Sequence, residues 1–208
     1  MQSQSLIRAV VDAAALRHNL HQVRRTAPDS RVMAVIKANA YGHGLEPAAK
    51  ALAEADGFAV ARLGEGLALR AAGLTNRILL LEGVFSAEQL AAAAQARFEL
   101  MVHSVEQLEL LDALTGDARV TAWIKVDSGM NRLGFRLDDF SAAYERLRRN
   151  VHVHADPTLV THLASADDRR DPKTRQQLDA FAAATAGLAG ARSMANSAGV
   201  LAWPTARA

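Results

Sequence analysis

A lysine beside a glycine-rich turn is the residue of this chain whose type and position best suit covalent chemistry. Lys37 ends an apolar run, and Tyr41, Gly42 and Gly44 follow it closely. A lysine in low-dielectric surroundings loses its proton more readily, and the neutral amine can form a Schiff base with an aldehyde. The glycines permit positive φ and close approach of a phosphate, to which the Tyr41 hydroxyl can donate. The competing interpretation is a solvated lysine next to an ordinary turn, the commoner situation for a lone lysine.

Further polar side chains follow later apolar runs of the sequence. Arg132 comes after a Ser-Gly turn, and its planar, permanently charged guanidinium suits a carboxylate or a phenolate oxygen. His162 ends another run, where a histidine can equally be a satisfied core residue. Asn196 and Ser197 open a helix-like stretch, whose first amides and hydroxyl can hold a phosphate or simply cap the helix.

The sequence gives no indication of a metal site. The chain has no cysteine, which excludes disulfides and thiolate ligands. His152 and His154 share one face of an extended segment, but a third ligand at metal-binding spacing is not evident. Apart from His162 and His43, which lies in the segment after Lys37, we therefore expect no metal at the remaining histidines: His18, His21, His103, His152 and His154.

The elements that must position the candidate residues alternate between strands and helices. Apolar runs predict strands over 31–36, 57–61, 77–81, 98–102, 120–126, 158–161 and 192–195. The stretches between and after them predict helices over 46–55, 64–72, 87–96, 104–114, 138–149, 172–188 and from 196 onward, with Ser104 as one expected N-cap. Strands without polar alternation, separated by helices, indicate a parallel sheet covered by helices.

Such an α/β sheet is either an open doubly wound sheet or a closed barrel. Seven strand–helix units follow residue 31, whereas a (β/α)8 TIM-type barrel needs eight in roughly 250 residues. We therefore expect residues 13–208 to form an incomplete barrel of about seven units, cut short at its C-terminal end. Residues 8–12 are strand-like, and Asp12 can cap a helix over 13–27. We expect residues 1–12 to supply a strand to a further domain.

Charge and hydropathy argue against two classes of partner. The chain has 24 basic and 22 acidic residues, a net charge of +2 that is too small and too scattered for a nucleic-acid surface. Charged residues interrupt every apolar stretch before it could cross a bilayer, and residues 1–11 lack the features of a secretory signal. We expect a soluble cytoplasmic protein.

Taken together, these residues resemble the alanine racemase family. The segment from Lys37 to Gly44, KANAYGHG, is similar to the cofactor-lysine signature of that family, and an eight-residue motif of this composition is highly specific. Further landmarks in the order of the family cover the whole chain: 16–19, 56–60, 125–134, 161–164 and 196–197. The resemblance implies pyridoxal 5′-phosphate as cofactor and a (β/α)8 barrel followed by a C-terminal β domain, which has no counterpart in these residues.

The resemblance also implies a role for each candidate residue. Lys37 would bind the cofactor and act as one catalytic base, while Arg132 would contact the cofactor phenolate beside the substrate carboxylate. His162 would support the cofactor ring. Lys125 matches a lysine that is often carbamylated in the family and then holds Arg132; an ordinary ion pair or an exposed lysine is the open alternative. The remaining candidates would contact the phosphate: Tyr41, Asn196 and Ser197.

The implied reaction is the interconversion of L-alanine and D-alanine, which supplies peptidoglycan synthesis, by a homodimer with active sites between its subunits. In the family the second base is a tyrosine from the C-terminal domain of the partner subunit, so we expect this chain to be inactive alone. Tyr144 lies in a helical pattern and is not expected to replace it. Two interpretations stay open beside this one: a non-catalytic protein of pyridoxal-phosphate homeostasis, and a decarboxylase of the same fold.

Overall fold

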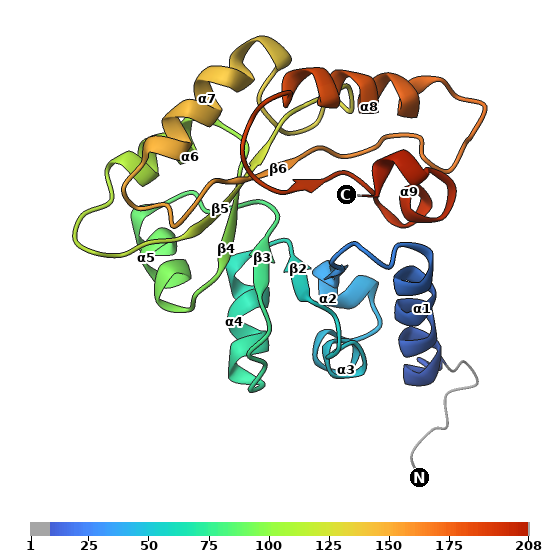
Figure 1. Cartoon of the computed structure of the whole chain (residues 1–208). Helices are drawn as coiled ribbons and strands as arrows, with labels where there is room; N and C mark the ends of the chain where they lie inside the picture. Colours follow the sequence, from blue (N-terminus) through green and yellow to red (C-terminus); the bar gives the residue numbers. More distant parts are fainter. Residues whose placement is uncertain (1–8, 208) are drawn as a thin grey trace.

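A single parallel sheet organises the chain (Figure 1). The computed structural model describes residues 9–207. Each strand pairs in parallel with the next one in the sequence, which is the strand order of a barrel rather than of a doubly wound sheet. The strands are β1 (Met33–Val35), β2 (Gly57–Val60), β3 (Ile78–Leu80), β4 (Glu99–Val102), β5 (Thr121–Lys125), β6 (Thr158–Val160) and β7 (Arg192–Ser193). The prediction of an incomplete barrel with seven units is confirmed.

Helices follow the strands and cover the outer face of the curled sheet (Figure 1). They are α1 (Ala13–Thr26), α3 (Leu45–Ala51), α4 (Leu63–Ala71), α5 (Ala87–Gln95), α6 (Val105–Asp112), α7 (Leu137–Arg149), α8 (Lys173–Ala184) and α9 (Ser197–Ala202), with a final 3₁₀ turn at Pro204–Ala206. The short segment labelled α2 (Lys37–Tyr41) is a left-handed turn. Among residues 9–207, β1 and β7 each pair with one strand only and not with each other, so the barrel is open between them. Helices α1 and α9, which belong to these two ends of the sheet, contact each other. No helix in this range is long and apolar enough to cross a membrane.

Both faces of the strands are buried, which explains why the apolar runs show no polar alternation. Residues such as Phe58 and Ile78 point outward and pack with helix residues such as Leu69. The alternate strand positions form a second cluster made of strand residues and Leu81, which follows β3, and this cluster fills the barrel interior. Its buried members are Ala59, Leu79, Met101, Trp123 and Val160.

A buried carboxylate lies at the N-terminal end of the barrel interior. Glu99, the first residue of β4, is 6% exposed and accepts two bonds from Arg77, at 2.5 Å from Nε and 2.9 Å from Nη2. The indole Nε1 of Trp123 donates to the same carboxylate at 2.7 Å. The bond to Glu99 raises the pKa of Arg77. A bidentate pair with a third donor satisfies the charge that this position buries.

Several helix ends differ from those expected. The helix predicted over 46–55 ends at Ala51, because the chain then turns into β2, and the one predicted over 172–188 ends at Ala184, shortly before Gly187 turns with a φ of 72°. Ser104 is the N-cap of α6, as predicted, but its side chain makes no bond to the first amides of the helix: its hydroxyl lies against the Glu106 carboxylate, whose pKa it lowers. The strand predicted over 192–195 is limited to β7, residues 192–193.

The N-terminal helix begins where the sequence predicts. The Asp12 side chain accepts bonds from the amides of Ala14, at 2.7 Å, and Ala15, at 3.3 Å, which confirms it as the cap of α1. Residues 9–12 are not in a strand, and residues 1–8 lie outside the described part of the chain. That residues 1–12 serve a further domain stays a prediction.

Candidate active site

The candidate residues follow the C-terminal ends of the strands, the end of a parallel barrel at which active sites lie. Lys37 follows β1, Lys125 ends β5, Arg132 lies in the loop after β5, and His162 follows β6. Because parallel strands present these ends to one side, the four side chains share the mouth of the barrel. Asn196 and Ser197, which follow β7, belong to the same edge.

The electrostatics of His162 show that the structure brings four of these residues together. The pKa of His162 is lowered to about 4, first by burial and then by the positive charges of Lys125, Arg132 and Lys37, in decreasing order of effect. A histidine in these surroundings is neutral at pH 7. The imidazole can therefore donate or accept a hydrogen bond without adding to the positive charge of the mouth.

Lys125 is the buried lysine of the site. It is 6% exposed, and its Nζ has no hydrogen-bond partner among the described residues. Its pKa is lowered to about 8: burial is the main cause, the Asp127 carboxylate opposes it, and the charge of Arg132 adds to it. A buried ammonium group without an acceptor is costly, so this position favours either the neutral amine or a modified, anionic form.

A pinned turn after β5 carries Arg132. The Asp127 carboxylate accepts bonds from the amides of Gly129, at 2.9 Å, and Asn131, at 3.0 Å. The loop is tied to the next one by the hydroxyls of Ser128 and Thr161, which are 2.7 Å apart. Arg132 lies exposed near the tip of this turn. Its guanidinium is therefore free to meet an anion at the mouth.

The turn after Lys37 is left-handed over four successive non-glycine residues, which the sequence did not predict. Ala38, Asn39, Ala40 and Tyr41 have φ values of 52°, 55°, 53° and 54°. For residues with a Cβ this conformation costs about 1–2 kcal/mol each. The Asn39 side chain stabilises the exit from the turn by accepting a bond of 2.8 Å from the Leu45 amide. Lys37 itself is half-buried.

The glycines at the tip of this turn adopt the positive φ that the sequence predicts for them. Gly42 and Gly44 have φ values of 89° and 92°, as the sequence predicts. A Cβ at Gly42 would meet nothing within 4 Å, so the space beside this backbone is open. Tyr41 is 60% exposed there, and its contact with a phosphate stays a prediction.

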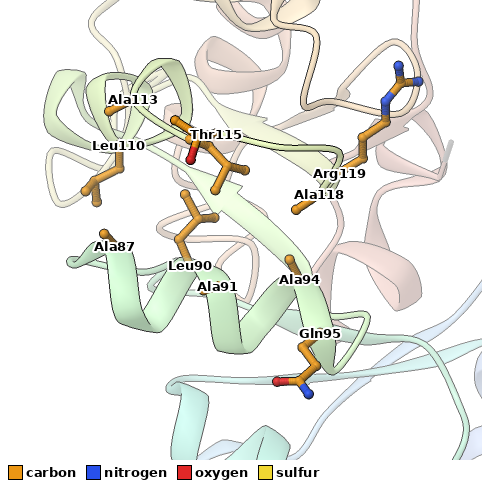
Figure 2. A pocket seen from close by; sticks show the side chains of 11 residues that line it. Ala87, Leu90, Ala91, Ala94, Gln95, Leu110, Ala113, Thr115, Ala118 and Arg119 are labelled. Atoms are coloured by element: carbon orange, nitrogen blue, oxygen red, sulfur yellow. The ribbon is translucent and has the colours of Figure 1, made fainter.

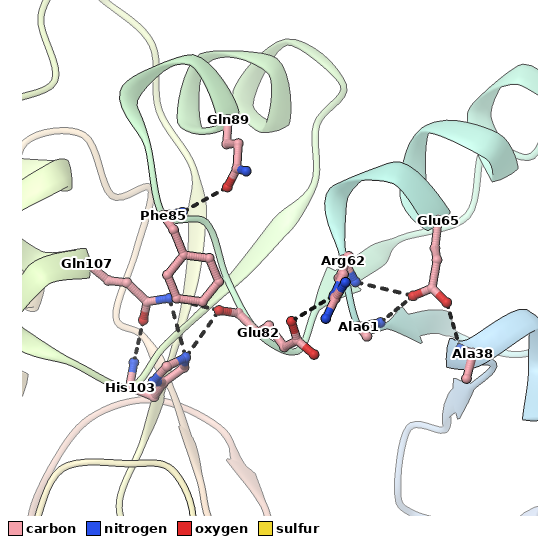
Figure 3. Close-up of polar contacts among 9 residues, drawn as sticks. All are labelled: Ala38, Ala61, Arg62, Glu65, Glu82, Phe85, Gln89, His103 and Gln107. Carbon is pink, nitrogen blue, oxygen red and sulfur yellow. Dashed lines mark hydrogen bonds and ion pairs between the residues drawn. The ribbon is translucent and has the colours of Figure 1, made fainter.

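Three helix side chains that sequence analysis missed tie the loops of the mouth together. Gln177 in α8 is fully buried, accepts from the Ala164 amide at 2.8 Å and donates to the His162 carbonyl at 2.9 Å. Gln107 in α6 accepts from the His103 amide at 2.9 Å and donates to the Glu82 carbonyl at 2.8 Å (Figure 3).

The third side chain is Glu65 in α4, which Figure 3 shows between the segments that follow β1 and β2. Isolated polar residues on helices match no motif, so a sequence offers no signal for such ties. Only the folded structure shows that these side chains pair with backbone N–H and C=O groups of the loops that would otherwise have no partner.

Asn196 and Ser197 lie at the start of α9. The Asn196 side chain accepts from the Gly199 amide at 2.8 Å and donates to the Leu163 carbonyl at 3.4 Å, so it is an N-cap. Ser197 is exposed at the first helical position. The capping role considered for this pair is present, and their contact with a phosphate stays a prediction.

An apolar groove on the outer face, between α5 and α6, is separate from this site (Figure 2). Alanine and leucine side chains such as Ala91, Leu90 and Leu110 line it, together with Arg119. None of the candidate residues reaches it. Within residues 9–207 no group of three His, Asp or Glu side chains is arranged to hold a metal ion.

Comparison with known proteins identifies the relatives of this chain. The model of the family "Alanine racemase, N-terminal domain" matches residues 11–208. Alanine racemase of Aeromonas hydrophila is 48% identical over 196 residues, which are 94% of this chain and 55% of that protein. Alanine racemase of Halorhodospira halophila is 52% identical over 198 residues, covering 95% of this chain and 54% of the relative.

Solved structures agree with the sequence comparison. The biosynthetic alanine racemase of Pseudomonas aeruginosa superposes with a TM-score of 0.90 at 45% identity, covering 95% of this chain and 55% of that one. Alanine racemase of Acinetobacter baumannii gives a TM-score of 0.86 at 32% identity, covering 95% and 58%. The chain thus spans about half the length of the relatives it matches. It belongs to the alanine racemase N-terminal domain family.

Proposed function

We propose that the protein carrying this chain interconverts L-alanine and D-alanine, with pyridoxal 5′-phosphate bound covalently to Lys37. The observation that carries the proposal is the cationic mouth around Lys37, on a chain whose family is that of the alanine racemases. The relatives described above are all alanine racemases, which favours racemisation over decarboxylation or cofactor storage.

The residues at the mouth fit an anionic, aldehyde-bearing cofactor. Among the ion pairs of the described residues, none involves Lys37, Lys125 or Arg132, so their positive charge is not neutralised by a carboxylate within 4.0 Å. The unpartnered Nζ of Lys125 is direct evidence of that excess. A phosphate, a phenolate and a substrate carboxylate are each the kind of group that such a cluster attracts. When bound, the cofactor supplies an electron sink for the α-carbon of an amino acid.

The protein side chains divide the remaining tasks. Lys37 would hold the cofactor and then take or return the α-proton on one face of the substrate. The Arg132 guanidinium would orient the substrate carboxylate and the cofactor phenolate. His162, neutral at pH 7, would support the cofactor ring without adding charge. The phosphate would lie among Tyr41, Asn196 and Ser197.

Lys125 is proposed to carry a carbamate. Its pKa of about 8 leaves about a tenth of the amine neutral at pH 7. The neutral Nζ would form a bond to the carbon of CO2 and release one proton, which converts a buried cation into a carbamate anion. Such an anion would pair with Arg132, so the buried group that has no partner as an ammonium would gain one as a carbamate.

The second base and the oligomeric state belong to the same proposal. Tyr144, the other tyrosine of the chain, is 1% exposed and donates to the Ala189 carbonyl at 3.0 Å, so it does not serve the mouth. We propose that a partner subunit of a cytoplasmic homodimer supplies a tyrosine. Exposed apolar side chains in the loops and helix starts after β1, β3, β4 and β5 support a protein contact there: Tyr41, Phe85, Val105, Leu133 and Leu137.

Covalent labelling tests the central claim. Pyridoxal phosphate added to the protein should give the absorbance of a lysine adduct, and borohydride reduction followed by peptide mapping should locate it on Lys37. Lys37→Ala should abolish both adduct and racemisation, while Lys50→Ala, at an exposed lysine paired with Glu46, should leave them unchanged. Adduct formation that persists in Lys37→Ala, or an enzyme that releases CO2 from amino acids, would overturn the proposal.

A further inference from the structure

The carboxylate of Glu65 binds the backbone of the two segments that follow the neighbouring strands β1 and β2 (Figure 3). Its Oε1 accepts a bond of 2.6 Å from the Ala38 amide, and its Oε2 accepts bonds from Ala61, at 2.7 Å, and Arg62, at 3.2 Å. Ala38 is the residue directly after Lys37. Glu65 therefore holds the backbone of the candidate cofactor lysine in place from a neighbouring helix.

Helix capping accounts for only part of this arrangement. Glu65 is the third residue of α4, and its bond to the Arg62 amide is the usual contact of a first-turn glutamate with the N-cap. The two shorter bonds lead out of the helix, to the residue after Lys37 and to the residue after β2. Three N–H groups thus meet two oxygens, and only a carboxylate offers an acceptor on both sides.

The turn held by this carboxylate is strained. Ala38 begins the left-handed segment, with a φ of 52°, a conformation that opposes its Cβ. Strained backbone persists only where neighbouring groups determine it. Loss of the bond to the Ala38 amide would let the segment relax and change the direction in which the Lys37 side chain leaves the backbone.

We propose that Glu65 is a positioning residue for Lys37, which fixes the left-handed turn and so sets the rate at which the Lys37 amine reaches a bound aldehyde. This inference rests on the proposed function, because it takes Lys37 as the cofactor lysine. Glu65 does not itself touch the reacting atoms. Its role is to keep the amine within the narrow geometry that a covalent step requires.

The test compares Glu65→Gln with Glu88→Gln in the protein that carries this chain. Both variants remove a first-turn carboxylate, but Glu88 in α5 bonds to Ser86 and its own backbone, whereas Glu65 bonds to the Ala38 amide in the turn after Lys37. In Glu65→Gln the single amide oxygen cannot serve both sides, so amide hydrogen exchange of residues 38–41, measured without cofactor, should accelerate about tenfold. The rate of borohydride-trapped labelling of Lys37 by pyridoxal phosphate should fall about 10- to 100-fold.

A second substitution separates positioning from simple loss of structure. Glycine adopts positive φ without the Cβ penalty, so Ala38→Gly in the Glu65→Gln background should restore the labelling rate about fivefold. Three results would each overturn the proposal. The first is amide exchange of residues 38–41 at the wild-type rate in Glu65→Gln, and the second is an equal change of exchange or labelling in Glu88→Gln. The third is a labelling rate of Glu65→Gln that Ala38→Gly does not raise. If the wild-type protein were never labelled at Lys37, the proposed function would fail, and hydrogen exchange would still judge the contact of Glu65 with the turn.

Discussion

The buried ammonium group of Lys125 should cost the protein stability that an apolar side chain would restore. The fall of its pKa from 10.5 to about 8, caused first by burial, corresponds to about 3 kcal/mol of free energy of unfolding. Lys125→Met keeps a similar unbranched shape and removes the charge. We expect the free energy of unfolding of the variant at pH 7 to be about 2–3 kcal/mol larger than that of the wild-type protein.

The dependence of this effect on pH follows from the two protonation states. Between about pH 8 and 10.5 the unfolded chain still binds the proton that the folded protein has lost, so the stability of the wild type rises with pH in that window. Below pH 8 the penalty is present in full. The advantage of Lys125→Met should therefore be largest at neutral pH and should disappear as the pH approaches 10.5.

Urea unfolding in buffer free of CO2 measures the difference, with Lys50→Met as the control for removing an exposed lysine. Added bicarbonate should stabilise the wild type and not Lys125→Met, because only the wild type can form a carbamate. A Lys125→Met protein that is less stable than the wild type at pH 7, or an advantage that does not change with pH, would refute the argument that the ammonium is a buried, unpaired charge.

Other substitutions probe the remaining contacts. Gln177→Leu leaves the His162 carbonyl and a backbone amide unpaired and should lower the free energy of unfolding by about 2–4 kcal/mol in urea titrations; an unchanged value would contradict the tie. Glu99→Gln removes the charge that pairs with Arg77 and should cost about 2 kcal/mol, measured the same way, with no loss expected if the pair were fully solvated. In NMR titrations the His162 ring should stay neutral down to about pH 5, and Lys125→Met should raise its pKa; a midpoint near 6.5 would show that it is solvated.

The architecture followed from the sequence because both faces of each strand are buried. Runs such as 57–61 and 98–102 carry no polar alternation, and only a parallel sheet covered by helices makes that pattern favourable. In the motif from Lys37 to Gly44, the positive φ of Gly42 and Gly44 could be predicted because glycine adopts it without a steric penalty. Strand order and the number of units needed no further information.

The details of the mouth could not be predicted, because they depend on contacts between distant segments. Nothing in the types of Ala38 or Ala40 favours a left-handed conformation, which the surrounding structure imposes. Gln177 resembles any polar residue of an amphipathic helix until the backbone groups that it satisfies are known. Glu99 begins an apolar strand, and only the fold brings Arg77 and Trp123 to its carboxylate.

The two ends of the barrel should respond to mutation in opposite ways. At the mouth, the unpaired Lys125 and the left-handed turn lower stability, and strain of this kind persists at functional sites because neighbouring contacts hold it. At the other end, Glu99 satisfies its donors and touches none of the candidate residues. Lys125→Met should therefore raise stability and impair racemisation, whereas Glu99→Gln should lower stability and leave the labelling rate of Lys37 unchanged below its melting temperature. If the labelling rate of Lys37 instead followed the free energy of unfolding in both variants, the geometry of the mouth would depend on the overall stability of the barrel and not on its own contacts.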